Sequence, residues 1–163
     1  MTRSSSVRLV LSLLPVVAVL AMASSTRAQT SVPFKGVFEG AFAINPADLQ
    51  LHFSGEGPAS HLGDSSLAGD SQLAPAGPGC FDIATDAVTL TAANGDQVFL
   101  TNAGQDCFDS TGRIVGAAVF TITGGTGRFA GATGSGSTQV VATPDQTGFA
   151  GTFILIFSGH ISY

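Results

Sequence analysis

The most regular feature of this sequence is an alternation of apolar and polar residues that begins at residue 34. Between residues 34 and 44 the even positions carry phenylalanine, glycine or isoleucine, while the odd positions include Lys35 and Glu39. A period of two residues is that of a β-strand with one buried face. We therefore predict a strand over residues 34–44 whose phenylalanines point toward the interior of the fold.

The same alternation recurs along the rest of the chain, interrupted by glycine, proline and asparagine at intervals typical of turns. No stretch of ten or more residues after residue 28 has the pattern of an amphipathic helix. These features predict an all-β protein, a single closed antiparallel β-barrel of about eight strands, because closure removes exposed sheet edges. The further strands are expected over residues 49–54 (with an extension toward 61), 65–73, 88–90, 98–100, 114–123, 131–142 and 148–161.

The last of these segments is apolar on both faces. Phe149, Phe153 and Phe157 share one face, and Ile154 and Ile156 lie on the other. A strand that is apolar on both faces is usually covered on both. The cover is expected to be a loop or a second subunit, so a homo-oligomer (dimer or trimer) is one of two open alternatives.

A β-hairpin and a disulfide are predicted from the middle of the chain. Asn94-Gly95 is a strong hairpin signal between two apolar runs, and a two-residue loop there would pair Ala93 with Asp96. That register brings Cys80 and Cys107 close together. The apolar phase shifts from odd to even positions between residues 83 and 88, which a bulge near residue 86 would explain. We predict a Cys80–Cys107 disulfide worth about 3 kcal/mol.

A glycine-rich segment covers residues 120–136. Gly124, Gly125, Gly127 and Gly131 supply the tight turn that joins two late strands. Phe129 is expected to fold back and plug the end of the barrel, and the next strand is expected to start at Gly131.

This segment resembles the glycine-rich signature of dirigent proteins and of the related allene oxide cyclase-type barrels. Residues 124–134 follow a Gly-Gly-Thr-Gly-x-Phe-x-x-Ala-x-Gly pattern, and the resemblance extends over residues 34–163. It implies an eight-stranded antiparallel barrel, often trimeric, with an apolar cavity, in a secreted bacterial-type member. The family shapes or catalyses the cyclisation of apolar substrates, but its functional acidic and basic residues have no motif counterpart here.

Residues 1–28 have the three parts of a secretory signal peptide. Arg3 and Arg8 form a basic start, an apolar run covers residues 9–23, and small residues precede a cleavage point after Ala23 or Ala28. The run is shorter than the roughly 20 residues of a membrane-spanning helix. We predict a signal peptide over 1–28, a barrel domain over 29–163, and a secreted or periplasmic location.

The charge of the predicted domain is strongly negative. After residue 28 the chain holds three basic residues against eleven acidic ones, a net charge of −8. Such a field repels phosphate backbones, so we predict no nucleic-acid partner.

Chemical groups with a catalytic spacing are scarce. Glu39 and His52 lie on adjacent strands, on the face opposite to the phenylalanines. They form either an acid–base pair or a solvent-exposed pair without a function. Glu56 is a further candidate carboxylate. The histidines are isolated and the cysteines are far apart in sequence, so no metal site and no cofactor are predicted.

The remaining indication of function is the phenylalanine-rich face of the predicted strands. Its residues either fill the barrel or line an apolar pocket, and the candidates for ligand binding are Phe34, Phe38, Phe42, Phe53, Phe149, Phe153 and Phe157. Two functions follow. The first is a non-catalytic binding or structural module with an apolar small-molecule ligand. The second is a cyclase or isomerase of the allene oxide cyclase or dirigent type, which requires a carboxylate such as Glu39 or Glu56 inside the barrel.

Overall fold

The computed structural model describes residues 29–84 and 87–163, and the predicted signal peptide lies outside them. Within these residues the chain forms nine strands and one short 3-10 helix, η1, and no α-helix. The elements are β1 (Ser31–Asn45), β2 (Gln50–Ala59), β3 (Gly63–Gly77), β4 (Cys80–Ala84), β5 (Val88–Ala92), β6 (Gln97–Phe108), β7 (Ile114–Gly125), η1 (Gly127–Phe129), β8 (Thr133–Pro144) and β9 (Ala150–Ser162).

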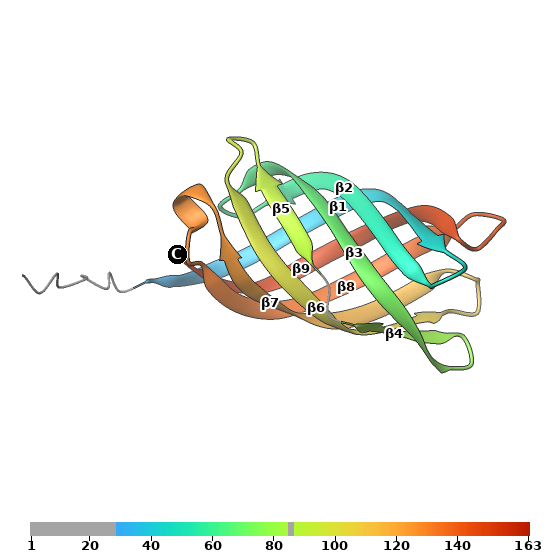
Figure 1. Ribbon diagram of the computed structural model, residues 1–163. Helices are drawn as coiled ribbons and strands as arrows, with labels where there is room; N and C mark the ends of the chain where they lie inside the picture. The colour runs from blue at the N-terminus through green and yellow to red at the C-terminus, as the bar shows by residue number, and fades with distance from the viewer. Residues whose placement is uncertain (1–28, 85–86) are drawn as a thin grey trace, which may run out of the picture.

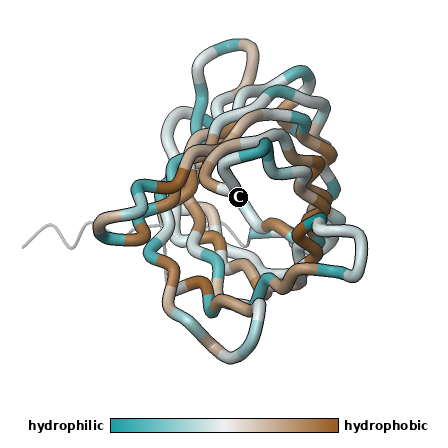
Figure 2. The backbone as a smooth tube through the Cα atoms, turned by 90° about the vertical axis from the view of Figure 1, so that its right-hand side faces the viewer, coloured by the Kyte–Doolittle hydropathy of each residue, from teal (hydrophilic) through white to brown (hydrophobic). Residues whose placement is uncertain are grey.

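The strands close into an antiparallel barrel. β2, β1, β9, β8, β7 and β6 follow one another as neighbours, and β3 completes the circle by pairing with β2. The short strands β4 and β5 both lie between β3 and β6, so together they occupy one place in the barrel. The result is the predicted eight-stranded barrel with one extra strand segment, seen from the side in Figure 1 and end-on in Figure 2.

The turn after β5 is one residue longer than predicted. The backbone N–H of Ala92 donates to the carbonyl oxygen of Asp96 at 2.8 Å, which leaves three residues in the loop. Gly95 takes a φ of 87°, the left-handed conformation that three-residue hairpin loops favour. The predicted pairing of Ala93 with Asp96 is therefore wrong.

The predicted disulfide is confirmed. Cys80 in β4 and Cys107 in β6 are direct partners across the two strands, with their Cα atoms 4.1 Å apart. The pairings of β4 and of β5 with β6 differ by one residue in register, which confirms the phase shift between Ile83 and Val88. The bulge suggested near Asp86 lies outside the described residues.

Aromatic rings fill the half of the barrel near the C-terminus. Phe34, Phe120 and Phe157 are at most 1% exposed and pack edge to face, with ring centroids 5.5 to 6.2 Å apart. Phe38 extends this cluster. The rings fit because glycines stand beside them: a Cβ on Gly159 would lie 2.8 Å from the Phe120 ring. This half of the barrel is a packed aromatic core.

Phe129 closes that end of the barrel, as predicted from the glycine-rich segment. Its ring is fully buried and packs against Tyr163, with ring centroids 5.0 Å apart. Gly127 and Gly131 have φ values of 56° and 76°, which let the chain turn inward and out again within a few residues. The following strand begins at Thr133, two residues later than predicted.

The outer face of β9 stays open to solvent in the single chain. Ile154 and Ile156 are 44% and 42% exposed, and their register neighbours Val141 and Val37 are equally exposed. No described loop covers these side chains, so the expected loop cover is not realised. Cover by a second subunit stays a prediction.

Candidate functional site: an apolar cavity at the open end of the barrel

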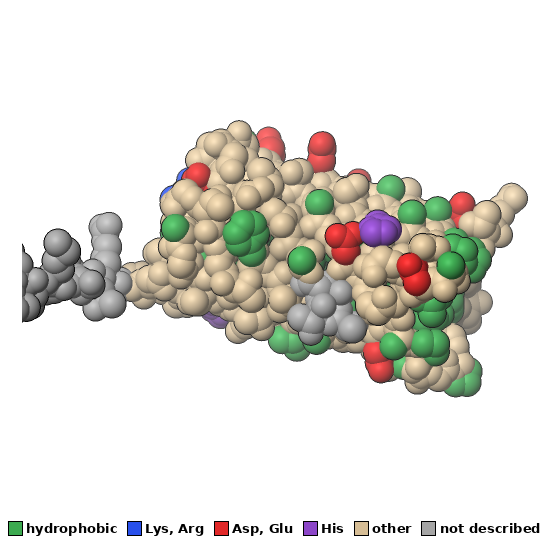
Figure 3. Space-filling view, in the orientation of Figure 1, with side chains coloured by type: hydrophobic (Ala, Val, Ile, Leu, Met, Phe, Trp, Pro, Cys, Tyr) green, Lys and Arg blue, Asp and Glu red, His purple; other side chains and the backbone are tan. Residues whose placement is uncertain are grey.

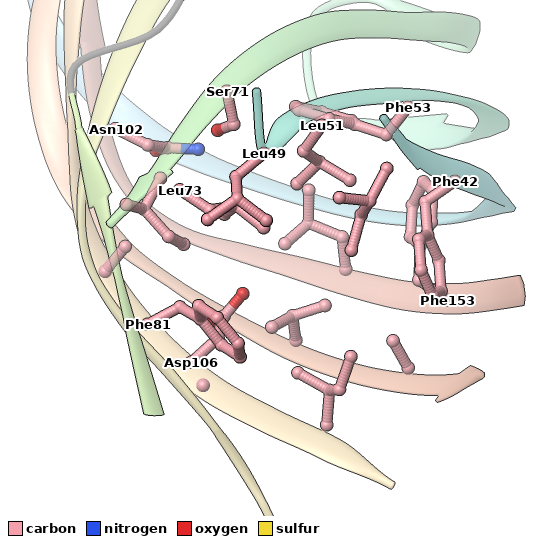
Figure 4. A pocket seen from close by; sticks show the side chains of 18 of the residues that line it. Phe42, Leu49, Leu51, Phe53, Ser71, Leu73, Phe81, Asn102, Asp106 and Phe153 are labelled. Atoms are coloured by element: carbon pink, nitrogen blue, oxygen red, sulfur yellow. The ribbon is translucent and has the colours of Figure 1, made fainter. Parts of the chain in front are cut away.

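The other half of the barrel is hollow. A cavity of about 350 Å³ lies between the strands and opens at the end that carries the loops β1–β2, β6–β7 and β8–β9. Apolar side chains from eight strands line it, among them Phe42, Leu51 and Leu73 (Figure 4). The two alternatives for the barrel interior, filled or hollow, therefore each hold for one half.

The seven phenylalanines proposed to bind a ligand are divided between these halves. Phe34, Phe38 and Phe157 belong to the packed core. The other four line the cavity, namely Phe42, Phe53, Phe149 and Phe153. Phe149 lies in the loop before β9 and is 44% exposed, so it forms part of the rim. Binding by these residues stays a prediction.

The rim of the cavity is aromatic. Phe81 from β4 and Phe108 from β6 pack edge to face with centroids 6.4 Å apart, and Phe108 is 43% exposed. The Cys80–Cys107 disulfide joins the neighbouring positions of the same two strands and so fixes this part of the rim. On the face in Figure 3, apolar side chains gather at the right-hand end, where the barrel opens.

Leu49 reaches the cavity from a strained backbone position. Its φ is 57°, a left-handed conformation that costs a residue with a side chain about 1 kcal/mol or more. Two backbone hydrogen bonds hold it there, from its own N–H to Asn45 (2.8 Å) and from the N–H of Leu73 to its carbonyl oxygen (3.1 Å). The side chain is thereby placed across the cavity beside Leu73 (Figure 4).

Two polar groups on β6 interrupt the apolar lining. Asn102 is 8% exposed, and both Asn102 and Asp106 point into the cavity (Figure 4). The Oδ1 atom of each is buried and accepts no hydrogen bond from the part of the chain that the structure describes. Both atoms are acceptors, so the wall of the cavity holds two buried acceptors that no described donor satisfies. Four residues along a strand separate their backbones by about 13 Å.

The carboxyl group of Asp106 has an unusual environment. Its partners across the neighbouring strands are Phe81 and Gly116, and neither offers a charge or a side-chain hydrogen bond. Burial alone raises the pKa of Asp106 to about 6. Within the described lining of the cavity, Asp106 is the one titratable side chain, and no lysine, arginine or histidine accompanies it.

The three residues proposed as catalytic candidates do not reach this cavity. Glu39, His52 and Glu56 are all exposed on the outside of the barrel. Glu39 lies opposite Glu56 across β1 and β2, and Nδ1 of His52 contacts Asp70, so the suggested Glu39–His52 pair does not form. These side chains occupy the alternate positions of their strands that face away from the barrel interior, so they lie in solvent. Among the described residues that line the cavity, the carboxyl group is that of Asp106, which was not one of the candidates.

Metal binding finds no support in the described ranges, residues 29–84 and 87–163. Within them no three histidine, cysteine, aspartate or glutamate side chains come together as a group that could hold an ion. The same residues form no helix of the length and hydrophobicity needed to cross a membrane.

Comparison with known proteins identifies the fold. No protein-family model and no curated protein matches the sequence. Among solved structures, the chain is similar to a pterocarpan synthase dirigent protein, with a TM-score of 0.50 and 12% sequence identity over 90% of this chain and 99% of that one. The chain has a dirigent-like barrel fold. At this identity the similarity establishes the fold alone, and the cavity of this dirigent-like barrel has to be interpreted from its own residues.

Proposed function

We propose that the protein is an exported binding module that holds a small apolar molecule in the open half of its barrel, without catalysing a reaction. The observation that carries this proposal is the cavity of about 350 Å³ with its aromatic rim. Ligand pockets are commonly concave, largely apolar and of 300–1,000 Å³, with a few polar groups that fix orientation. Asn102 and Asp106 are groups of that kind.

The division of the barrel supports binding over a purely structural role. A chain that needed only stability would gain from filling the second half as it fills the first, since each buried methylene contributes roughly 0.8 kcal/mol. Instead, small residues such as Ala118 and Ala142 face the cavity, and the strained Leu49 borders it. The hollow is therefore maintained at a cost in stability, which is common at binding sites.

Export is part of the proposal. The disulfide between Cys80 and Cys107 is typical of proteins that mature in an oxidising compartment. Together with the signal-like residues 1–28, it supports a secreted or periplasmic protein. Mass determination of the N-terminus of the exported protein tests this point and locates the cleavage, with Ala23 and Ala28 as the two expected positions.

The second candidate is a cyclase or isomerase of the dirigent or allene oxide cyclase type. One observation favours it: the carboxyl group of Asp106 lies inside the apolar cavity, where burial raises its pKa to about 6, and it could donate a proton to a bound substrate. The described lining residues include no second titratable side chain that could act as a base beside Asp106. Catalysis of this type would therefore rely on the shape of the cavity and on a single proton donor.

The binding proposal is tested with methylnaphthalene, whose fluorescence is easily followed because the chain contains no tryptophan and one tyrosine. We expect saturable binding to the wild type. Ala142→Phe, which places a ring in the cavity, should weaken binding at least tenfold, whereas Val141→Phe on the outer face of the same strand should leave it unchanged. Absence of saturable binding to the wild type, or equal binding by both variants, would refute the proposal.

A further inference from the structure

We infer that Asp106 makes this cavity selective for apolar molecules that carry a protonated amine. The inference rests on the proposed binding function and adds the chemical class of the ligand. It follows from the position of one carboxyl group, from what surrounds it, and from what the rest of the cavity lacks.

Asp106 lacks a partner among the described residues. Its Oδ1 atom is buried and accepts no hydrogen bond from the described residues, and the cavity lining described above contains no basic side chain. A carboxylate that is removed from water without a counter-charge is destabilised, and a ligand that supplies a positive N–H group removes that destabilisation. An alcohol supplies a neutral donor and gains less, and a carboxylate ligand would be repelled.

Charged groups near the mouth of the cavity are engaged elsewhere. Arg113, in the loop between β6 and β7, is engaged by Asp109 through two hydrogen bonds, from Nε (3.1 Å) and from Nη2 (3.0 Å). Asp82, next to Phe81 on β4, is exposed on the outer face and accepts a hydrogen bond from Gln105 at 3.0 Å. Arg113 is thus committed to another carboxylate, and Asp82 is engaged on the outside of the barrel, so neither charged group serves as a partner for Asp106.

The rings of Phe42 and Phe153 and the side chain of Leu51 line the cavity on the side away from β6 (Figure 4). A ligand with its amine at Asp106 and an aromatic or aliphatic body across the cavity would satisfy both regions at once.

The test compares four ligands of one shape: naphthylmethylamine, naphthylmethanol, naphthoate and methylnaphthalene. At pH 8 we expect the wild type to bind the amine about tenfold more tightly than the alcohol and to bind naphthoate least. Asp106→Asn should reduce the amine preference to within about twofold while methylnaphthalene binding remains. Asp82→Asn, which removes an exposed charge from the neighbouring strand, should keep the preference.

A measurement on the wild type alone gives a second criterion. Neither Phe81 nor Gly116, the residues that face Asp106 from β4 and β7, titrates. The affinity for the amine should therefore rise between pH 5 and pH 7, as Asp106 ionises, and then level off. Equal affinity for amine and alcohol, an unchanged preference in Asp106→Asn, or a loss of preference in Asp82→Asn would overturn the inference. Binding of methylnaphthalene without amine preference would leave the proposed function intact, whereas failure of all four ligands to bind would refute both.

Discussion

The carboxyl group of Asp106 lies directly against the backbone of Gly116, its partner across β6 and β7. A Cβ atom added to Gly116 would overlap Oδ1 of Asp106. The glycine therefore provides the space in which the carboxyl group stays inside the barrel. The buried acid depends on the glycine that accommodates it, and substitution of either residue should change the free energy of unfolding.

The pH dependence of stability should report the burial of Asp106. Because burial raises its pKa to about 6 from an ordinary value of 3.8, the folded chain keeps a proton between these values that the unfolded chain has lost. Stability therefore falls as pH rises through this window and levels off above it. We expect the free energy of unfolding to decrease by about 2 kcal/mol between pH 4 and pH 7, measured by urea denaturation.

Two variants serve as controls for this pH effect. Asp106→Asn should abolish the decrease, whereas Asp82→Asn, on the outer face, should retain it. Asp109 and Asp145 act in the opposite direction: hydrogen bonds from Thr111 and Thr147 lower their pKa values, so their contribution is present above the ordinary carboxyl pKa and is lost as pH falls below it. A stability that rises from pH 4 to pH 7 would contradict the burial of Asp106.

The substitution Gly116→Ala should destabilise the protein by about 1–3 kcal/mol, because the added methyl group displaces the Asp106 side chain from a tightly packed position. Part of this loss should be recovered in the double variant with Asp106→Ala, where the carboxyl group is gone. The remainder reflects the contact of the new Cβ with the backbone of Gln105. A double-mutant cycle of unfolding free energies measures the coupling, and strictly additive losses would show that the two residues do not share this space.

The strand pattern could be predicted from sequence because alternation survives wherever one face of a strand is buried. It placed Phe34 and Phe157 inside, it located the phase shift before Val88, and it made Glu39 and His52 outward-facing. It could not separate a packed half from a hollow half, since both are lined by apolar residues. That difference depends on how many rings meet at one level of the barrel, which is a property of strand register.

Asp106 was missed for a related reason. The inward face of β6 runs from Val98 and Leu100 through Asn102 to Asp106, so its apolar signal ends halfway along the strand. The signal that could have found it is parity, because the even positions of this strand from Val98 onward face inward and Asp106 is one of them. A charged residue on the inward parity of a barrel strand is a candidate site residue even when its neighbours are polar.

Two phenylalanines should respond to truncation in opposite ways. Phe129→Ala removes a fully buried ring from the closed end of the barrel and should cost about 3–5 kcal/mol of stability while methylnaphthalene binding persists in the folded fraction. Phe149→Ala removes a ring that is 44% exposed at the rim and should cost less than about 1 kcal/mol while weakening that binding. Thermal unfolding and fluorescence titration of both variants provide the comparison. Loss of binding in folded Phe129→Ala would indicate that the ligand binds in the closed half of the barrel, contrary to the proposal.

Leu49 offers a test of whether backbone strain is maintained for the cavity. Replacing it by glycine relieves a left-handed conformation worth about 1–2 kcal/mol and removes a half-buried side chain of similar value, so Leu49→Gly should change stability by less than about 1 kcal/mol. Leu51→Gly, in the regular strand β2, has no strain to relieve and should cost about 3 kcal/mol. Both variants remove a wall of the cavity and should weaken methylnaphthalene binding to a similar extent. If Leu49→Gly were as destabilising as Leu51→Gly, the side chain would be needed for folding, and its strained position could not be attributed to the ligand site.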